Sequence, residues 1–131
     1  MKGDRHPFEY AVLRVVPRVE RGESINAGVL VYCRALDYLG AAVHLDVDRL
    51  RALDPGVDVP HVEAALRSMA DACTSDGAGP AAAEDIGRRF RWLTSPRSTV
   101  VQAGPVHTGL TADPPAETQR LLKVLVLSLD P

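Results

Sequence analysis

Phe8-Glu9-Tyr10-Ala11-Val12-Leu13-Arg14-Val15-Val16 is the stretch of sequence that decides the fold. β-branched and aromatic residues dominate it and Pro17 follows it, which is typical of a β-strand. Two similar apolar runs follow at residues 25–33 and 38–45, with a short turn-like connection between them. Three such runs in succession predict an antiparallel meander.

Helical periodicity begins after the third run. Leu50 and Leu53 predict a short helix over residues 47–53. Asp58 can cap a second helix, and Pro60 fits its first turn. One buried stripe of this helix is indicated by apolar residues at spacings of four, three and four: Val62, Leu66, Met69 and Cys73.

The second half of the chain mixes helix and strand patterns. Residues 74–80 are rich in Gly, Ser and Pro and predict a loop. Residues 84–93 predict a helix, followed by a fourth strand over residues 98–102 and a fifth strand or an extended lid over residues 106–110. The arginines of this helix are expected to lie mostly outward: Arg88, Arg89 and Arg91.

A final helix is predicted to begin at Asp113, with Pro114 at its first position. The order of these elements predicts one α+β domain over residues 1–131. We expect an antiparallel sheet of four to five strands with helices packed on one face.

Composition excludes several classes of protein. The 131 residues are 46% hydrophobic and 24% charged, the balance of a globular domain. The apolar runs are shorter than the ~20 residues that cross a bilayer, and the N-terminus has no apolar signal core, so we expect a cytoplasmic protein without a membrane partner. Cys33 and Cys73 lie in apolar patterns and are expected to be buried thiols.

The charge distribution argues against a nucleic-acid partner. Net charge is −2, and residues 37–86 carry ten acidic side chains against three basic ones. The four histidines are scattered and no Cys-x-x-Cys occurs, so neither a metal site nor a cofactor is expected. No phosphate-binding loop, dinucleotide fingerprint or nucleophile elbow is present, so the sequence leaves open whether the protein is an enzyme.

A first polar cluster follows the first strand. It comprises Arg18, Glu20, Arg21 and Glu23, and Asn26 closes it where the second strand begins. Alternating guanidinium and carboxylate groups can hold an anion and tune an acid or base. A solvated loop of mutual salt bridges explains the same pattern.

A second polar cluster lies at residues 92–109. Trp92, Arg97, Ser98 and His107 can meet at one end of a strand, where Arg97 and Ser98 would bind phosphate or His107 would transfer a proton. The alternative places Trp92 in the core, pairs Arg97 with Glu20 or Glu23, and has His107 satisfy a loop carbonyl group.

The segments 10–29, 92–102 and 107–110 resemble the signature segments of a bacterial domain-of-unknown-function family, number 3037 (DUF3037). The resemblance spans about residues 8–126. Members are small bacterial proteins whose genes often lie beside a gene for a HipA-like serine/threonine kinase. The resemblance therefore implies an accessory or regulatory protein that binds such a kinase.

Three interpretations remain at this stage. In the first, the loop 18–26 and the surface of Arg97 and His107 bind a protein partner. In the second, Arg18, Arg21 and Arg97 hold an anionic small molecule bearing phosphate or carboxylate, with His107 or Glu23 as acid or base. In the third, the charged residues only form salt bridges that pin the loop to the sheet.

Overall fold

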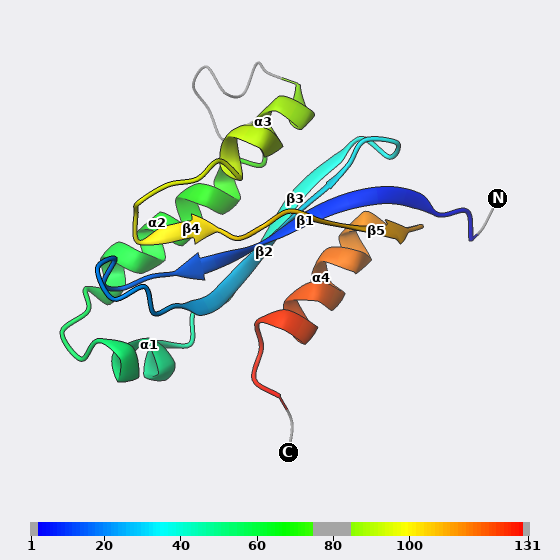
Figure 1. Cartoon of the computed structure of the whole chain (residues 1–131). Helices are drawn as coiled ribbons and strands as arrows, with labels where there is room; N and C mark the ends of the chain where they lie inside the picture. The colour runs from blue at the N-terminus through cyan, green and yellow to red at the C-terminus, as the bar shows by residue number, and fades with distance from the viewer. Residues whose placement is uncertain (1–2, 75–84, 130–131) are drawn as a thin grey trace.

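A computed structural model describes residues 3–74 and 85–129 (Figure 1). The strands are β1 (His6–Val15), β2 (Ile25–Cys33), β3 (Tyr38–Val43), β4 (Val101–Ala103) and β5 (His107–Thr111). The helices are α1 (Val47–Leu53), α2 (Val59–Asp71), α3 (Ile86–Leu93) and α4 (Pro114–Leu125). The predicted α+β class is confirmed.

The five strands form one antiparallel sheet. Its order is β3-β2-β1-β4, and β5 also pairs with β1. The two short strands share the outer edge of β1, with β5 opposite His6–Tyr10 and β4 opposite Leu13–Val15. The predicted meander of the first three strands is confirmed, and each late strand lies within a few residues of its predicted range.

Helices cover both faces of the sheet. Leu30 and Tyr32 of β2 pack with residues of α1, α2 and α3, whereas Val29 and Val31 pack with Leu121 of α4. Figure 1 shows α4 on the opposite side of the sheet from α2 and α3. The expectation of helices on one face holds for α1–α3 and is corrected for α4. The reason is that β2 is apolar on both faces, so both faces need cover.

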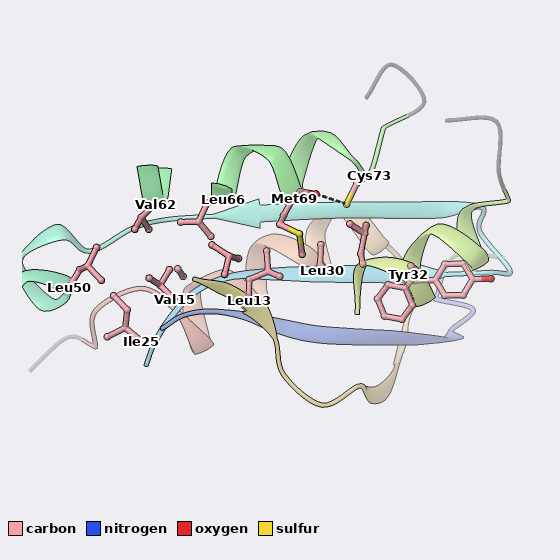
Figure 2. Close-up of a cluster of buried hydrophobic side chains, with 14 residues drawn as sticks. Leu13, Val15, Ile25, Leu30, Tyr32, Leu50, Val62, Leu66, Met69 and Cys73 are labelled. Carbon is pink, nitrogen blue, oxygen red and sulfur yellow. Dashed lines mark hydrogen bonds between the residues drawn. The ribbon is translucent and has the colours of Figure 1, made fainter. Parts of the chain in front are cut away.

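The helix boundaries follow from their capping residues. Asp58 accepts a hydrogen bond from the backbone N–H of His61, and Asp113 accepts one from the N–H of Ala116, as the sequence predicts. The apolar stripe of α2 is buried and contributes to the cluster in Figure 2: Val62, Leu66, Met69 and Cys73. The predicted loop over residues 74–80 lies outside the described residues from residue 75 onward.

One arginine of α3 departs from the expected outward position. Arg89 is 3% exposed and its Nη1 donates to the carbonyl oxygen of Cys73 at 3.4 Å. It precedes Phe90, which is fully buried, so both side chains lie on the inner side of the helix. Arg88 and Arg91 are exposed, as expected.

Candidate functional site

A groove runs between α2 and the chain that leads from the end of α3 into β4. Its volume is about 650 Å³. We call it the Trp92 groove. Its lining comprises His61, Ala65, Ser68, Met69, Ala72, Trp92, Leu93, Arg97, Thr99, Val100 and Val101. Most of these side chains are apolar, and none is acidic, so the groove offers an apolar floor with a basic rim.

Trp92 and Arg97 are in direct contact on this rim. The guanidinium carbon of Arg97 lies 4.6 Å from the centroid of the Trp92 ring, within the range of cation–π attraction. Its Nη2 donates to the Trp92 carbonyl oxygen at 2.6 Å, and its Nη1 lies 3.7 Å from the sulfur of Met69. Trp92 is nevertheless 55% exposed. The pair is therefore held in place while an aromatic face stays open to solvent.

The sequence after α3 explains why Arg97 returns to Trp92. The hydroxyl of Thr94 donates to the carbonyl oxygen of Phe90 at 2.9 Å, and that of Ser95 donates to the carbonyl oxygen of Arg91 at 2.9 Å. These bonds satisfy the last carbonyl groups of the helix, and Pro96 cannot continue it. The chain turns back at this point, which places Arg97 beside the last turn of α3.

The loop between β1 and β2 forms a separate charged cluster. Arg18 lies 3.5 Å from the Asp54 carboxylate at the end of α1 and 3.8 Å from that of Glu20. Arg21 pairs with Glu23 at 2.6 Å. The groove that Arg97 lines contains none of these loop residues. The predicted convergence of Arg18, Arg21 and Arg97 in that groove is therefore absent.

The Arg21–Glu23 pair gives a measurable pH effect. The hydrogen bond from Arg21 lowers the pKa of Glu23 below its ordinary value of 4.5. We expect NMR titration of the Glu23 carboxyl to give a midpoint below 4.5 that returns toward 4.5 in Arg21→Gln. The pair is lost as pH falls through this lowered pKa, but its exposure to solvent keeps the effect on stability small. An unchanged midpoint in the variant would show that the pair does not form in solution.

The remaining predicted residues lie elsewhere. Asn26 donates from Nδ2 to the carbonyl oxygen of Leu125 at 3.0 Å and so caps the end of α4. The ring of His107 lies 5.3 Å from that of Tyr10, which packs on the α4 side of the sheet. Ser98 is exposed beside Arg97 but does not line the groove. Of the nine predicted residues, the structure joins Trp92 with Arg97, with Ser98 next along the chain. The loop residues and His107 make no contact with this pair in the part of the chain that the structure describes.

The geometry corrects the roles that the alternative interpretation gives to Trp92 and Arg97. Trp92 is not a core residue, because more than half of its surface is exposed. Arg97 forms no ion pair with Glu20, Glu23 or any other carboxylate in the described part of the chain. Its guanidinium instead binds a carbonyl oxygen and a ring, which leaves its positive charge unneutralised.

Sequence reasoning missed the wall of the groove that α2 provides. His61, Ala65, Ser68 and Ala72 recur at the same spacings as the buried stripe of this helix, displaced by one residue toward its N-terminus. Small residues at three of these positions leave space beside the helix. This second stripe of small side chains is the sequence pattern from which the groove beside α2 can be predicted.

The described residues contain neither a metal-binding cluster nor a membrane-spanning helix. No group of three or more His, Cys, Asp or Glu side chains is placed to hold a metal ion there. No helix in the described ranges is both long and apolar enough to cross a membrane. Cys33 and Cys73 are buried free thiols, and burial raises the pKa of Cys73 to about 12.

Comparison with known proteins gives the family of the chain. Searches of curated proteins and of solved structures find no significant match. A family model described as "Protein of unknown function (DUF3037)" matches residues 10–126, nearly the whole chain. The chain therefore belongs to the DUF3037 family, in agreement with the resemblance of its signature segments.

Proposed function

We propose that this protein is an accessory protein that binds a partner protein through the Trp92 groove. The observation that carries the proposal is an exposed tryptophan, with Arg97 fixed on its ring, beside an apolar groove without acidic lining. Trp and Arg, together with Tyr, are enriched among the residues that dominate the binding energy of interfaces. Held in one geometry before binding, they lose little conformational entropy when a partner docks.

The chemistry of the groove defines the segment it recognises. Ala65, Ala72 and Val100 are partly exposed and offer apolar contact beside Trp92. Arg97 offers a positive charge that no described carboxylate neutralises. The complementary segment carries apolar side chains and one carboxylate placed against Arg97. The family resemblance supports a HipA-like kinase as the protein that supplies this segment.

An affinity purification tests the proposal. The tagged protein is used to capture partners from its native host, beside Arg97→Gln and the control Arg67→Gln, and mass spectrometry identifies what is captured. Arg67 is exposed on α2 and does not line the groove. We expect a kinase-like protein to be captured by wild type and control and to be lost from Arg97→Gln. Equal recovery by all three forms would contradict the proposed surface.

A small carboxylate or phosphate is the second candidate for the groove. Its volume of about 650 Å³ is that of a small-molecule site, and Arg97 is the group that would bind the anion. The same three forms distinguish the candidates. A small ligand would raise the melting temperature of the isolated wild type and of Arg67→Gln but not of Arg97→Gln, without any captured protein.

A further inference from the structure

A second groove, of about 800 Å³, lies at the other end of α3, beside the end of β2 and the turn into β3. We call it the Tyr32 groove. Its lining comprises Tyr32, Arg34, Asp37, Asp85, Ile86, Gly87, Arg88 and Arg91. Three guanidinium groups and a phenol hydroxyl thus share one concave surface, which neither the predicted clusters nor the Trp92 groove includes.

Tyr32 places in this groove a hydroxyl that forms no hydrogen bond within the described residues. The residue is 9% exposed, and its ring stacks on that of Phe90 with centroids 5.4 Å apart. Figure 2 shows the hydroxyl pointing away from the other labelled core side chains. No residue in the described ranges hydrogen-bonds to it. The hydroxyl is therefore free to donate to an acceptor that enters the groove.

Gly87 keeps the space around this hydroxyl open. A Cβ atom at position 87 would lie 2.7 Å from the hydroxyl oxygen of Tyr32 and 3.3 Å from its Cζ. A larger residue would therefore displace the hydroxyl or fill the groove beside it. The glycine in the first turn of α3 is explained by this approach, although glycine weakens a helix.

The three arginines are not equivalent. Arg91 is held by a bidentate pair with Glu9, with Nη1 and Nη2 at 2.9 and 2.8 Å from the two carboxylate oxygens. Arg34 and Arg88 form no ion pair with a carboxylate of the described residues. Within the described ranges these two charges are unpaired, while Arg91 has a fixed orientation.

The acidic residues of the lining are placed differently. The Asp85 carboxylate accepts the backbone N–H of Gly87 at 2.6 Å and caps α3. Asp37 lies in the turn after β2, where its φ of 51° is left-handed. The lining carries three guanidinium groups and two carboxylates, and Glu9 pairs with Arg91. Arg34 and Arg88 are therefore the cationic groups that this groove offers to a ligand.

We propose that the Tyr32 groove binds a phosphate monoester. The hydroxyl of Tyr32 donates to one phosphate oxygen, and Arg34 and Arg88 donate to the others. Guanidinium groups match the geometry of phosphate oxygens, and hydrogen bonds to a charged acceptor are the strong ones. The phosphate belongs to a small phosphorylated molecule or to a phosphorylated side chain of a protein, and both present the same group to this groove.

Calorimetry with two probes tests the site and distinguishes the sources. The probes are free phosphoserine and a short peptide that contains phosphoserine. They are titrated into wild type, Tyr32→Phe, Arg88→Gln and the control Arg67→Gln. Tyr32→Phe keeps the ring on Phe90 and removes only the hydroxyl. We expect about tenfold weaker binding in Tyr32→Phe and in Arg88→Gln, and an unchanged affinity in the control.

The relative affinities of the two probes distinguish a phosphorylated protein from a small phosphorylated molecule. Tighter binding of the peptide assigns the site to a phosphorylated protein, and equal binding of both probes assigns it to a small molecule. No binding of either probe at millimolar concentration would overturn the proposal, as would equal affinity in wild type and Arg88→Gln. Because Arg88 is exposed, its variant keeps the test valid even if Tyr32→Phe loses stability.

Discussion

Replacement of Phe90 by alanine is expected to lower the free energy of unfolding by about 3–5 kcal/mol. Phe90 is the largest of the fully buried side chains. Its ring stacks on Tyr32 of β2, and the guanidinium of Arg91 lies 5.4 Å from its centroid. Alanine would leave a cavity between α3 and the sheet, which the packed neighbours can close only in part.

Urea unfolding measured by circular dichroism gives this value, with Arg88→Ala as the control. Arg88 is exposed on the same helix, so its loss should change stability by no more than about 0.5 kcal/mol. A loss below about 1.5 kcal/mol for Phe90→Ala would mean that α3 is not anchored on the sheet through this ring. Both proposed grooves are built on α3 and depend on that anchor.

Replacement of Trp92 by alanine is expected to weaken partner binding by at least about 30-fold, which corresponds to about 2 kcal/mol. The variant removes the exposed aromatic face and also the ring on which Arg97 rests. Arg97 would keep its charge and lose its fixed orientation, so each remaining hydrogen bond to the partner would cost more entropy. Stability should change little, because Trp92 is 55% exposed.

The dissociation constant of the captured partner, measured by calorimetry, tests this expectation. Leu110→Ala is the matched control, because Leu110 is a large apolar residue on β5 with 58% exposure. It should bind as wild type does. Equal affinities of Trp92→Ala and wild type would exclude the Trp92 groove as the interface.

Much of the fold can be predicted from local patterns. The runs that became β1, β2 and β3 lie close together along the chain, and short connections leave few ways to pair them. The α2 and α4 boundaries follow from Asp58 and Asp113, whose side chains cap the first turn. The order of elements alone predicts helices on one face of the sheet. The unbroken apolar run of β2 indicates instead that both faces are covered.

Which of the predicted site residues meet is harder to predict, because this depends on where each residue lies along the paired strands. His107 pairs with Tyr10, five residues before the end of β1, and the charged loop follows that end. At about 3.4 Å per residue, this separation along the strand is about 17 Å. Two polar clusters that are each plausible in sequence are therefore held apart by the length of one strand.

Trp92 and Arg97 were predicted to act together, and their contact is local. Only a short turn separates the two residues, so the geometry at the end of α3 determines their contact. The burial of Arg89 has a local signal in its spacing, because it lies three residues after Ile86 and four before Leu93 on the inner face of the helix. Its charge pointed to the outer face instead. The Tyr32 groove was missed because Tyr32 reads as a core residue of β2, and only the approach of Gly87 shows where its hydroxyl lies.

Amide hydrogen exchange of the protein with and without its captured partner tests the central claim most directly. The account predicts slower exchange over residues 61–72 and 92–101, the two walls of the Trp92 groove, with β5 unchanged. Protection confined to β5 or to the charged loop of residues 18–24, with the groove unaffected, would contradict it.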